Sequence, residues 1–173
     1  MMRLSTLPNT IMLEGNHERH IANFAFNSNL DHSKRFMKEV VAPIVKDMTK
    51  KDVESLQREL RLFYKSLRQC YPFSFHGKKY LVSHAGLSYV PNMTFIATST
   101  FINGFGAYET DIAKIYDNNY EKGMCQNFIQ IHGHRGVPDG KYSFCLEGEV
   151  EFGGELKYID ITADDFTKNG IKN

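Results

Sequence analysis

The feature that most constrains the fold is a pattern that occurs three times: a short apolar run followed at once by a polar motif containing histidine. The runs cover residues 10–13, 79–82 and 128–131, and the motifs that follow are Glu14-Gly15-Asn16-His17-Glu18, Ser83-His84-Ala85-Gly86 and His132-Gly133-His134. A short apolar run bounded by glycine and turn residues is typical of a buried strand. Because strand ends in α/β sheets line up along one edge, where ligands bind, we expect the motifs to lie together. The pattern predicts one α/β domain spanning residues 1–173.

The residue types in these motifs suit a metal site. An asparagine amide oxygen can bind a metal, and the neighbouring imidazole of His17 can protonate a leaving group. Amide and imidazole groups gathered at one edge favour a divalent transition metal such as Mn, Fe or Zn. Each motif alone has a plainer interpretation: the first is also a loop with a capping Asn16, and a lone His84 after a strand is more often a buried imidazole. The three motifs in this order make coincidence improbable.

The middle of the chain has helical periodicity. Residues 34–48 carry apolar side chains at helical spacing, although Pro43 interrupts the pattern. After Thr49, apolar residues advance by alternating steps of three and four, which predicts an amphipathic helix, and Thr49 with Asp52 forms a capping-box start. The charged residues of this helix are expected to form a solvated face: Lys51, Glu54, Arg58, Glu59, Arg61 and Lys65.

Turn signals and apolar runs define the remaining elements. Residues 73–83 predict a β-hairpin around His76-Gly77, with a buried second strand. Residues 107–120 predict a helix, and residues 143–146 and 156–161 predict strands.

Composition excludes several classes of protein. The chain has 173 residues, is 42% hydrophobic and carries a formal net charge of +1, so no global field favours nucleic acid or a membrane surface. The three cysteines have no metal-binding spacing, and we expect them to pack in a reducing compartment. No apolar run approaches the roughly 18 residues of a membrane span. The first ten residues lack the apolar core of a secretion signal, so the sequence predicts a cytoplasmic location.

The three motifs together resemble the calcineurin-like metallophosphoesterases, in their phosphoprotein-phosphatase-like branch. The resemblance also extends to bacterial and phage phosphatases related to polynucleotide-repair and dinucleoside-tetraphosphate-cleaving enzymes, mainly through residues 83–87 and 152–156. It implies a phosphatase whose two metal ions, manganese, iron or zinc, are bridged by an aspartate and activate the attacking water. The implied fold is part of a four-layer α-β-β-α sandwich without its N-terminal strands. The implied partner is a phosphorylated protein, nucleotide or nucleic-acid end, with no membrane.

The resemblance assigns roles to individual residues. It gives Asn16, His84 and His134 to the second metal and makes His17 the general acid for the leaving alkoxide. Glu18 is then expected to orient His17 or the neighbouring backbone. An imidazolium beside a phosphate dianion is stabilised by the opposite charge, which suits His17 to this role.

The residues around the third motif leave alternatives open. Gly136 excludes the Gly-His-x-His variant, so His132 is expected to pack or to support a ligand rather than bind metal. Arg135 either binds substrate phosphate or makes a surface salt bridge. The segment 104–108, with Gly104, Gly106 and Tyr108, matches a cap over the active site in some relatives, and a simple loop is equally plausible. Residues 152–156 resemble the family's closing hairpin, with turn glycines.

The upstream half of the family signature is missing from this chain. Neither Asp-x-His nor Gly-Asp-x-x-Asp-Arg-Gly occurs, so the first metal has no ligands and at most one metal is expected from the chain's own residues. Three explanations compete: a fragment of a longer enzyme, one half of a split enzyme whose partner supplies the aspartates, or a non-catalytic phosphate-binding or protein-interaction module. The sequence favours the fragment, with activity near background for this chain alone.

Overall fold

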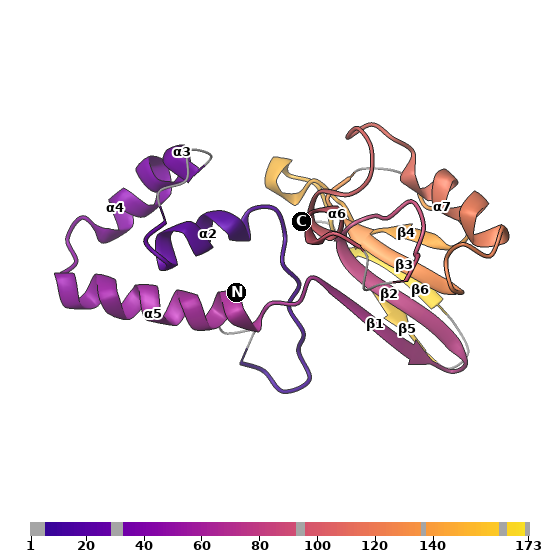
Figure 1. The fold of residues 1–173 in the computed structure, drawn as a ribbon, viewed down its shortest axis with the longest axis horizontal. Helices are drawn as coiled ribbons and strands as arrows, with labels where there is room; N and C mark the ends of the chain where they lie inside the picture. The colour runs from indigo at the N-terminus through magenta and orange to yellow at the C-terminus, as the bar shows by residue number, and fades with distance from the viewer. Residues whose placement is uncertain (1–5, 29–32, 93–95, 136–137, 163–165, 172–173) are drawn as a thin grey trace. The chain divides into compact units, whose positions relative to one another are not determined.

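The computed structural model describes residues 6–28, 33–92, 96–135, 138–162 and 166–171 (Figure 1). The chain forms a mixed α/β structure with two compact units, residues 1–68 and 69–173, and each unit is described by itself. The single domain expected from the sequence stays a prediction, because two compact units can belong to one domain. Among the described residues, no helix is long and apolar enough to cross a membrane.

The first unit is helical. Its elements are α2 (Glu18–Ala25), α3 (Lys34–Phe36), the π-helical turn η2 (Met37–Val41), α4 (Ala42–Val45) and α5 (Lys50–Ser66). Helix α2 packs against α5, where Phe24 and Phe63 are buried. The buried Gln57 amide of α5 donates to the Phe24 carbonyl at 3.0 Å and to Oδ1 of Asn27 at 2.6 Å. The first bond satisfies a backbone carbonyl near the end of α2 and the second an amide side chain just after it, so both help to fix the two helices against each other.

Helix α5 begins as the sequence predicts. The Thr49 hydroxyl accepts from the Asp52 backbone N–H at 3.3 Å, and the Asp52 carboxylate accepts from the Thr49 N–H at 3.2 Å. The charged face of α5 is exposed as expected, except at Arg61. Its guanidinium reaches back to the Ala25 carbonyl at 2.7 Å, near the C-terminal end of α2, where a cation is favourable.

Pro43 interrupts the preceding helix, as the sequence predicts, without ending it. Helical structure continues from Lys34 to Val45, but the turn directly before Pro43 is the π-helical η2. Proline lacks a backbone N–H and its ring crowds the carbonyl four residues earlier. A π-helical turn absorbs that conflict by widening the helix at the point where the ordinary bond is lost.

The strand expected at residues 10–13 is reduced to one β-bridge. Leu13 pairs in parallel with Arg68. The Arg68 N–H donates to the Met12 carbonyl at 2.9 Å, and the Glu14 N–H donates to the Arg68 carbonyl at 2.8 Å. Ile11 is 43% exposed, so the run is not buried. The prediction of a buried strand is therefore wrong here: a strand requires a neighbour of similar length, and among the described residues this run pairs with Arg68 alone.

The second unit contains a four-stranded sheet in the order β1 (Cys70–Phe75), β2 (Lys78–Ala85), β3 (Phe128–Gly133) and β4 (Ser143–Cys145). Strands β1 and β2 are antiparallel, whereas β2, β3 and β4 are mutually parallel neighbours. The predicted hairpin is confirmed: His76 and Gly77 connect β1 to β2 with φ of 45° and 77°. Positive φ at both positions is the signature of a type I′ turn.

The parallel crossover between β2 and β3 contains α6 (Thr98–Asn103) and α7 (Ile112–Glu121) (Figure 1). The helix predicted over residues 107–120 begins later, because the Asp111 carboxylate caps it by accepting from the Lys114 N–H at 3.1 Å. Helix α6 packs on β2. The core of the unit gathers buried side chains from β2, both crossover helices and the connecting loops: Leu81, Leu87, Val90, Phe101, Tyr116 and Cys125.

The C-terminal part of the unit forms a separate two-stranded antiparallel sheet. Strand β5 (Leu156–Ile161) was predicted from its alternating pattern, whereas β6 (Phe166–Ile171) was not. Before β5, the 3-10 turn η4 (Val150–Phe152) ends at Gly153 with φ of 84°. The glycines of residues 152–156 are therefore turn residues, as expected.

Candidate functional site

The second unit brings His84 and His134 together at the carboxyl edge of two adjacent parallel strands. Ala85 of β2 lies opposite Gly133 of β3, so His84 precedes one member of this pair and His134 follows the other. The two imidazole ring centroids are 4.8 Å apart, with ring planes inclined by 40°. Both side chains are half-buried. His134 has a φ of 65°, which turns the chain at the end of β3.

This pair provides two nitrogen donors for a transition metal. Imidazole nitrogen suits Zn or Fe, and the two rings lie close enough for both to contact one cation. Within the described parts of the chain, no three His, Cys, Asp or Glu side chains are arranged to hold a metal. The predicted third ligand, Asn16, belongs to the first unit. The structure therefore assembles two of the three predicted ligands within one unit.

The carboxylates of Glu18 and Glu14 make the hydrogen bonds that hold the Gly-Asn-His-Glu turn of the first unit. Residues 16–17 form the turn that leads into α2, as the sequence predicts. The Glu18 carboxylate accepts from the Gly15 N–H at 2.8 Å, so Glu18 fixes the neighbouring backbone, one of its two expected roles. The N-cap of α2 is His17, which makes no side-chain capping bond, and the alternative of a capping Asn16 stays a prediction.

Tyr64 of α5 stabilises the same turn and was not found from the sequence. Its hydroxyl donates to the Glu14 carboxylate at 2.6 Å. Burial first, then the hydrogen bond and charge of Glu14 and the charge of Glu18, together raise the pKa of Tyr64 to about 12. A tyrosine on a helix carries no sequence signal that identifies a partner fifty residues away.

His17 is exposed and has another histidine beside it. The His17 and His20 ring centroids are 6.1 Å apart. His20 stacks on Phe36 at 5.4 Å and is within hydrogen-bond distance of the Ser33 hydroxyl at 2.9 Å. His20 therefore packs near the motif, and the exposed His17 ring is accessible to a ligand. The polar turn sequence around His32 predicts a solvated side chain, but His32 lies outside the described residues.

His132 belongs to a buried polar network, in agreement with the expectation that it packs. It is 1% exposed, and its Nε2 lies 3.3 Å from the Ser143 hydroxyl. Gln130 donates to the same hydroxyl at 2.7 Å, and its amide also binds the backbone N–H and carbonyl of Leu87. A Cβ added to Gly86 would lie 3.0 Å from the His132 ring. The second and third motifs therefore touch through a glycine and an imidazole.

Arg135 adopts an arrangement that differs from both sequence alternatives. The residue is 3% exposed, so a surface salt bridge is excluded. Its guanidinium donates to the carbonyls of Asn103 and Phe105 at 2.8 Å and to those of Gly106 and Ala107. In this conformation the guanidinium is occupied by a loop of its own chain and is not presented to a substrate phosphate. Gly136 lies outside the described residues.

The loop that Arg135 binds leads to Tyr108, whose ring contacts His134 edge-on. The two ring centroids are 5.9 Å apart and the planes are inclined by 83°. Of the two expectations for residues 104–108, this contact favours a segment that covers part of the site over a loop without a role. The sequence signal was the Gly-x-Gly-x-Tyr spacing itself.

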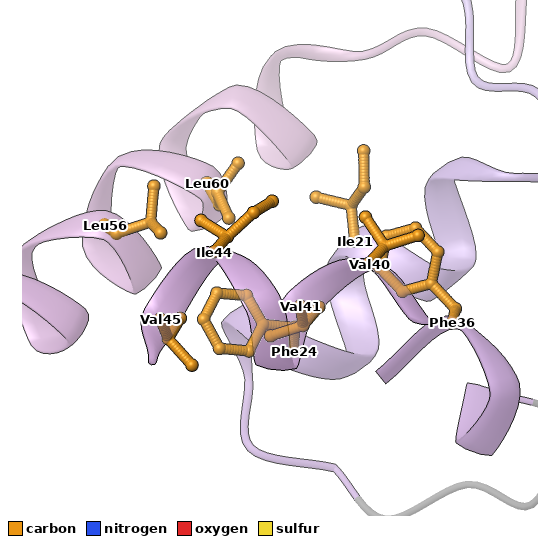
Figure 2. A pocket seen from close by; sticks show the side chains of 9 residues that line it. All are labelled: Ile21, Phe24, Phe36, Val40, Val41, Ile44, Val45, Leu56 and Leu60. Carbon is orange, nitrogen blue, oxygen red and sulfur yellow. The ribbon is translucent and has the colours of Figure 1, made fainter. Parts of the chain in front are cut away.

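A separate apolar pocket lies in the helical unit (Figure 2). Its volume is about 200 Å³, and Figure 2 shows hydrocarbon side chains from α2, the 34–45 helical run and α5 around it. They are Ile21, Phe24, Phe36, Val40, Val41, Ile44, Val45, Leu56 and Leu60. A pocket with this lining offers no group for acid–base or metal chemistry.

In comparisons with known proteins, no family model matches the sequence and no curated protein matches it. Any functional conclusion therefore depends on the residues and their geometry.

Proposed function

We propose that this chain supplies part of the active site of a metal-dependent phosphoesterase of the calcineurin-like type, in its phosphoprotein-phosphatase-like branch. The observation that carries the proposal is the His84–His134 pair, 4.8 Å between ring centroids at the carboxyl edge of adjacent parallel strands. The proposed reaction is hydrolysis of a phosphomonoester or phosphoanhydride. The mixed sheet with its crossover helices would be one part of a four-layer α-β-β-α sandwich.

In this proposal, His84, His134 and Asn16 hold one divalent metal. Two imidazoles and an amide oxygen fit manganese, iron or zinc. When bound, the metal polarises a phosphoryl oxygen and offsets charge that develops during hydrolysis. His17, whose ring is exposed, would supply the proton that the leaving oxygen takes up. Glu14 and Glu18 hold the turn in which His17 lies.

The chemistry of the three proposed metal ligands limits the phosphatase activity expected from this chain alone. All three proposed ligands are neutral, whereas a dication is best balanced by carboxylates. The bridging aspartate and the first metal's ligands would have to come from another polypeptide segment, whether a missing N-terminal half of the same enzyme or a separate partner chain. We therefore expect activity near background from this chain alone with Mn²⁺ and an aryl phosphate. Robust turnover under those conditions would show that no further carboxylates are needed.

Metal binding tests the proposal without relying on turnover. In calorimetric titrations with Zn²⁺, His84→Ala and His134→Ala should each weaken binding by at least about tenfold, since even groups that only support a metal ligand contribute that much. His76→Ala is a matched control, because His76 is an exposed histidine in the hairpin turn of the same unit. Equal affinity in all four proteins would remove the metal site and favour a non-catalytic binding module.

A further inference from the structure

Arg135 is a buried cation whose hydrogen bonds all go to one loop. Its four carbonyl acceptors, Asn103, Phe105, Gly106 and Ala107, lie within five consecutive residues. Among the described residues, no ion pair places a carboxylate on this guanidinium, and its Nε has no hydrogen-bond partner. Burying a guanidinium is costly unless its donors are satisfied. The loop is therefore held where its carbonyls compensate Arg135, and displacement would leave a buried charge.

Two glycines allow loop 103–107 to approach the Arg135 guanidinium closely. Gly104 and Gly106 have φ of 77° and 71°, a region that side chains other than glycine rarely adopt. A Cβ on Gly104 would lie 2.8 Å from Nε of Arg135. Glycine at position 104 is thus required both by the backbone and by the guanidinium packed against it.

The same loop delivers Tyr108 to His134, the residue directly before Arg135. The Tyr108 ring meets the His134 ring edge-on at 5.9 Å, and His134 in turn lies 4.8 Å from His84. His134 directly follows the end of β3 and has a left-handed backbone. A ring packed against its face or edge restricts the orientations that an imidazole can adopt.

We propose that Arg135 is a positioning residue: it fixes loop 103–107 and thereby holds Tyr108 against the His134 imidazole. The functional meaning of this inference rests on the proposed metal site. There, the contact with Tyr108 orients the ligand His134 before the metal binds. A ligand held in its productive orientation loses less freedom on binding. Arg135 then acts through Tyr108 and touches no substrate.

The test is the chemical shift of the His134 ring protons, measured by NMR at one fixed pH in the full-length chain without metal. Tyr108→Ala should move these resonances, because the neighbouring aromatic ring is removed. Arg135→Gln should move them in the same direction by at least half as much, because the loop is released. Gly104→Ala should do the same, because its Cβ would lie 2.8 Å from Nε of Arg135 and separate the loop from a guanidinium that is still present. Tyr89→Ala, an exposed tyrosine of the same unit, should leave them unchanged.

Two results would overturn the inference. If Tyr108→Ala leaves the His134 resonances in place, the two rings do not pack together. If Arg135→Gln or Gly104→Ala lowers the melting temperature but leaves those resonances in place, Arg135 has a structural role only. Should Arg135→Gln fail to fold, Gly104→Ala decides the same question.

The shifts also separate this inference from the proposed function. If the His134 resonances move in the three variants but the chain does not bind Zn²⁺, the inference is supported and the metal site is removed. If the chain binds Zn²⁺ through His84 and His134 but the His134 resonances do not move in the variants, the metal site is supported and the inference is removed.

Discussion

Replacing Gly86 by alanine tests the contact that joins the second and third motifs. The added Cβ would lie 3.0 Å from Cε1 and Nε2 of His132 and 3.1 Å from Cδ2, closer than real Cβ atoms normally approach. The His132 ring cannot easily give way, because it is 1% exposed and lies between the Gly133 carbonyl at 3.1 Å and the Ser143 hydroxyl at 3.3 Å. Gly86 does not have the left-handed backbone that would itself disfavour alanine.

Two opposing effects set the change in the free energy of unfolding caused by Gly86→Ala. Overpacking a filled core costs about 1–3 kcal/mol, whereas Gly→Ala gains about 0.4–1 kcal/mol by restricting the unfolded chain. We expect a net loss of about 1–2 kcal/mol. For a chain of this length that loss lowers the melting temperature by about 2–8 °C, which thermal unfolding followed by circular dichroism measures directly.

A matched control comes from the same sheet edge. The nearest atom to a Cβ on Gly133 is the His84 carbonyl oxygen at 3.7 Å, an ordinary contact, so Gly133→Ala should leave the melting temperature equal or slightly raised. Combining Gly86→Ala with His132→Ala should relieve the clash, with a coupling energy of about 1 kcal/mol or more. A Gly86→Ala protein that melts at or above the wild-type temperature would refute the packing described here.

Three further predictions concern the first unit. Thr49→Ala removes the hydroxyl that caps α5, so unfolding by urea should show a loss of about 1 kcal/mol, whereas Ser55→Ala on the same helix should show little change. For Tyr64 the folded pKa is raised above the unfolded value of 10.0 to about 12, so its contribution to stability is complete below pH 10 and is lost as pH rises toward 12. Tyr64→Phe should abolish that part of the decline, and an unchanged pH profile would exclude a raised pKa for Tyr64. In an enzyme completed with the missing carboxylates, His17→Ala should slow esters with poor leaving groups far more than activated aryl esters, and equal slowing would remove His17 as the acid.

Elements with strong local signals were predicted correctly. The capping box at Thr49 and Asp52, the type I′ turn at His76-Gly77 and the buried strand β2 all depend on residues close together in sequence. The meeting of His84 and His134 was also predictable, because it needs only that two apolar runs form neighbouring parallel strands. In each case local chemistry and the final structure agree.

The errors and omissions depend on contacts between distant residues. The run at residues 10–13 looks like a buried strand, but its pairing is limited to Arg68, fifty-five residues after Leu13, which no local pattern indicates. The charged Arg135 was expected to face a phosphate or solvent, since arginine is rarely buried. Its burial depends on four carbonyls in a glycine-containing loop some thirty residues earlier.

The most direct test concerns the cation that Asn16, His84 and His134 are proposed to share. Mn²⁺ added to the isotopically labelled chain broadens NMR signals of nuclei near the ion. We predict that the side-chain amide of Asn16 and the ring protons of His84 and His134 broaden together at the same low Mn²⁺ concentration, while the His76 ring is unaffected. Broadening of the two histidines without Asn16, or of none of the three, would contradict a shared site.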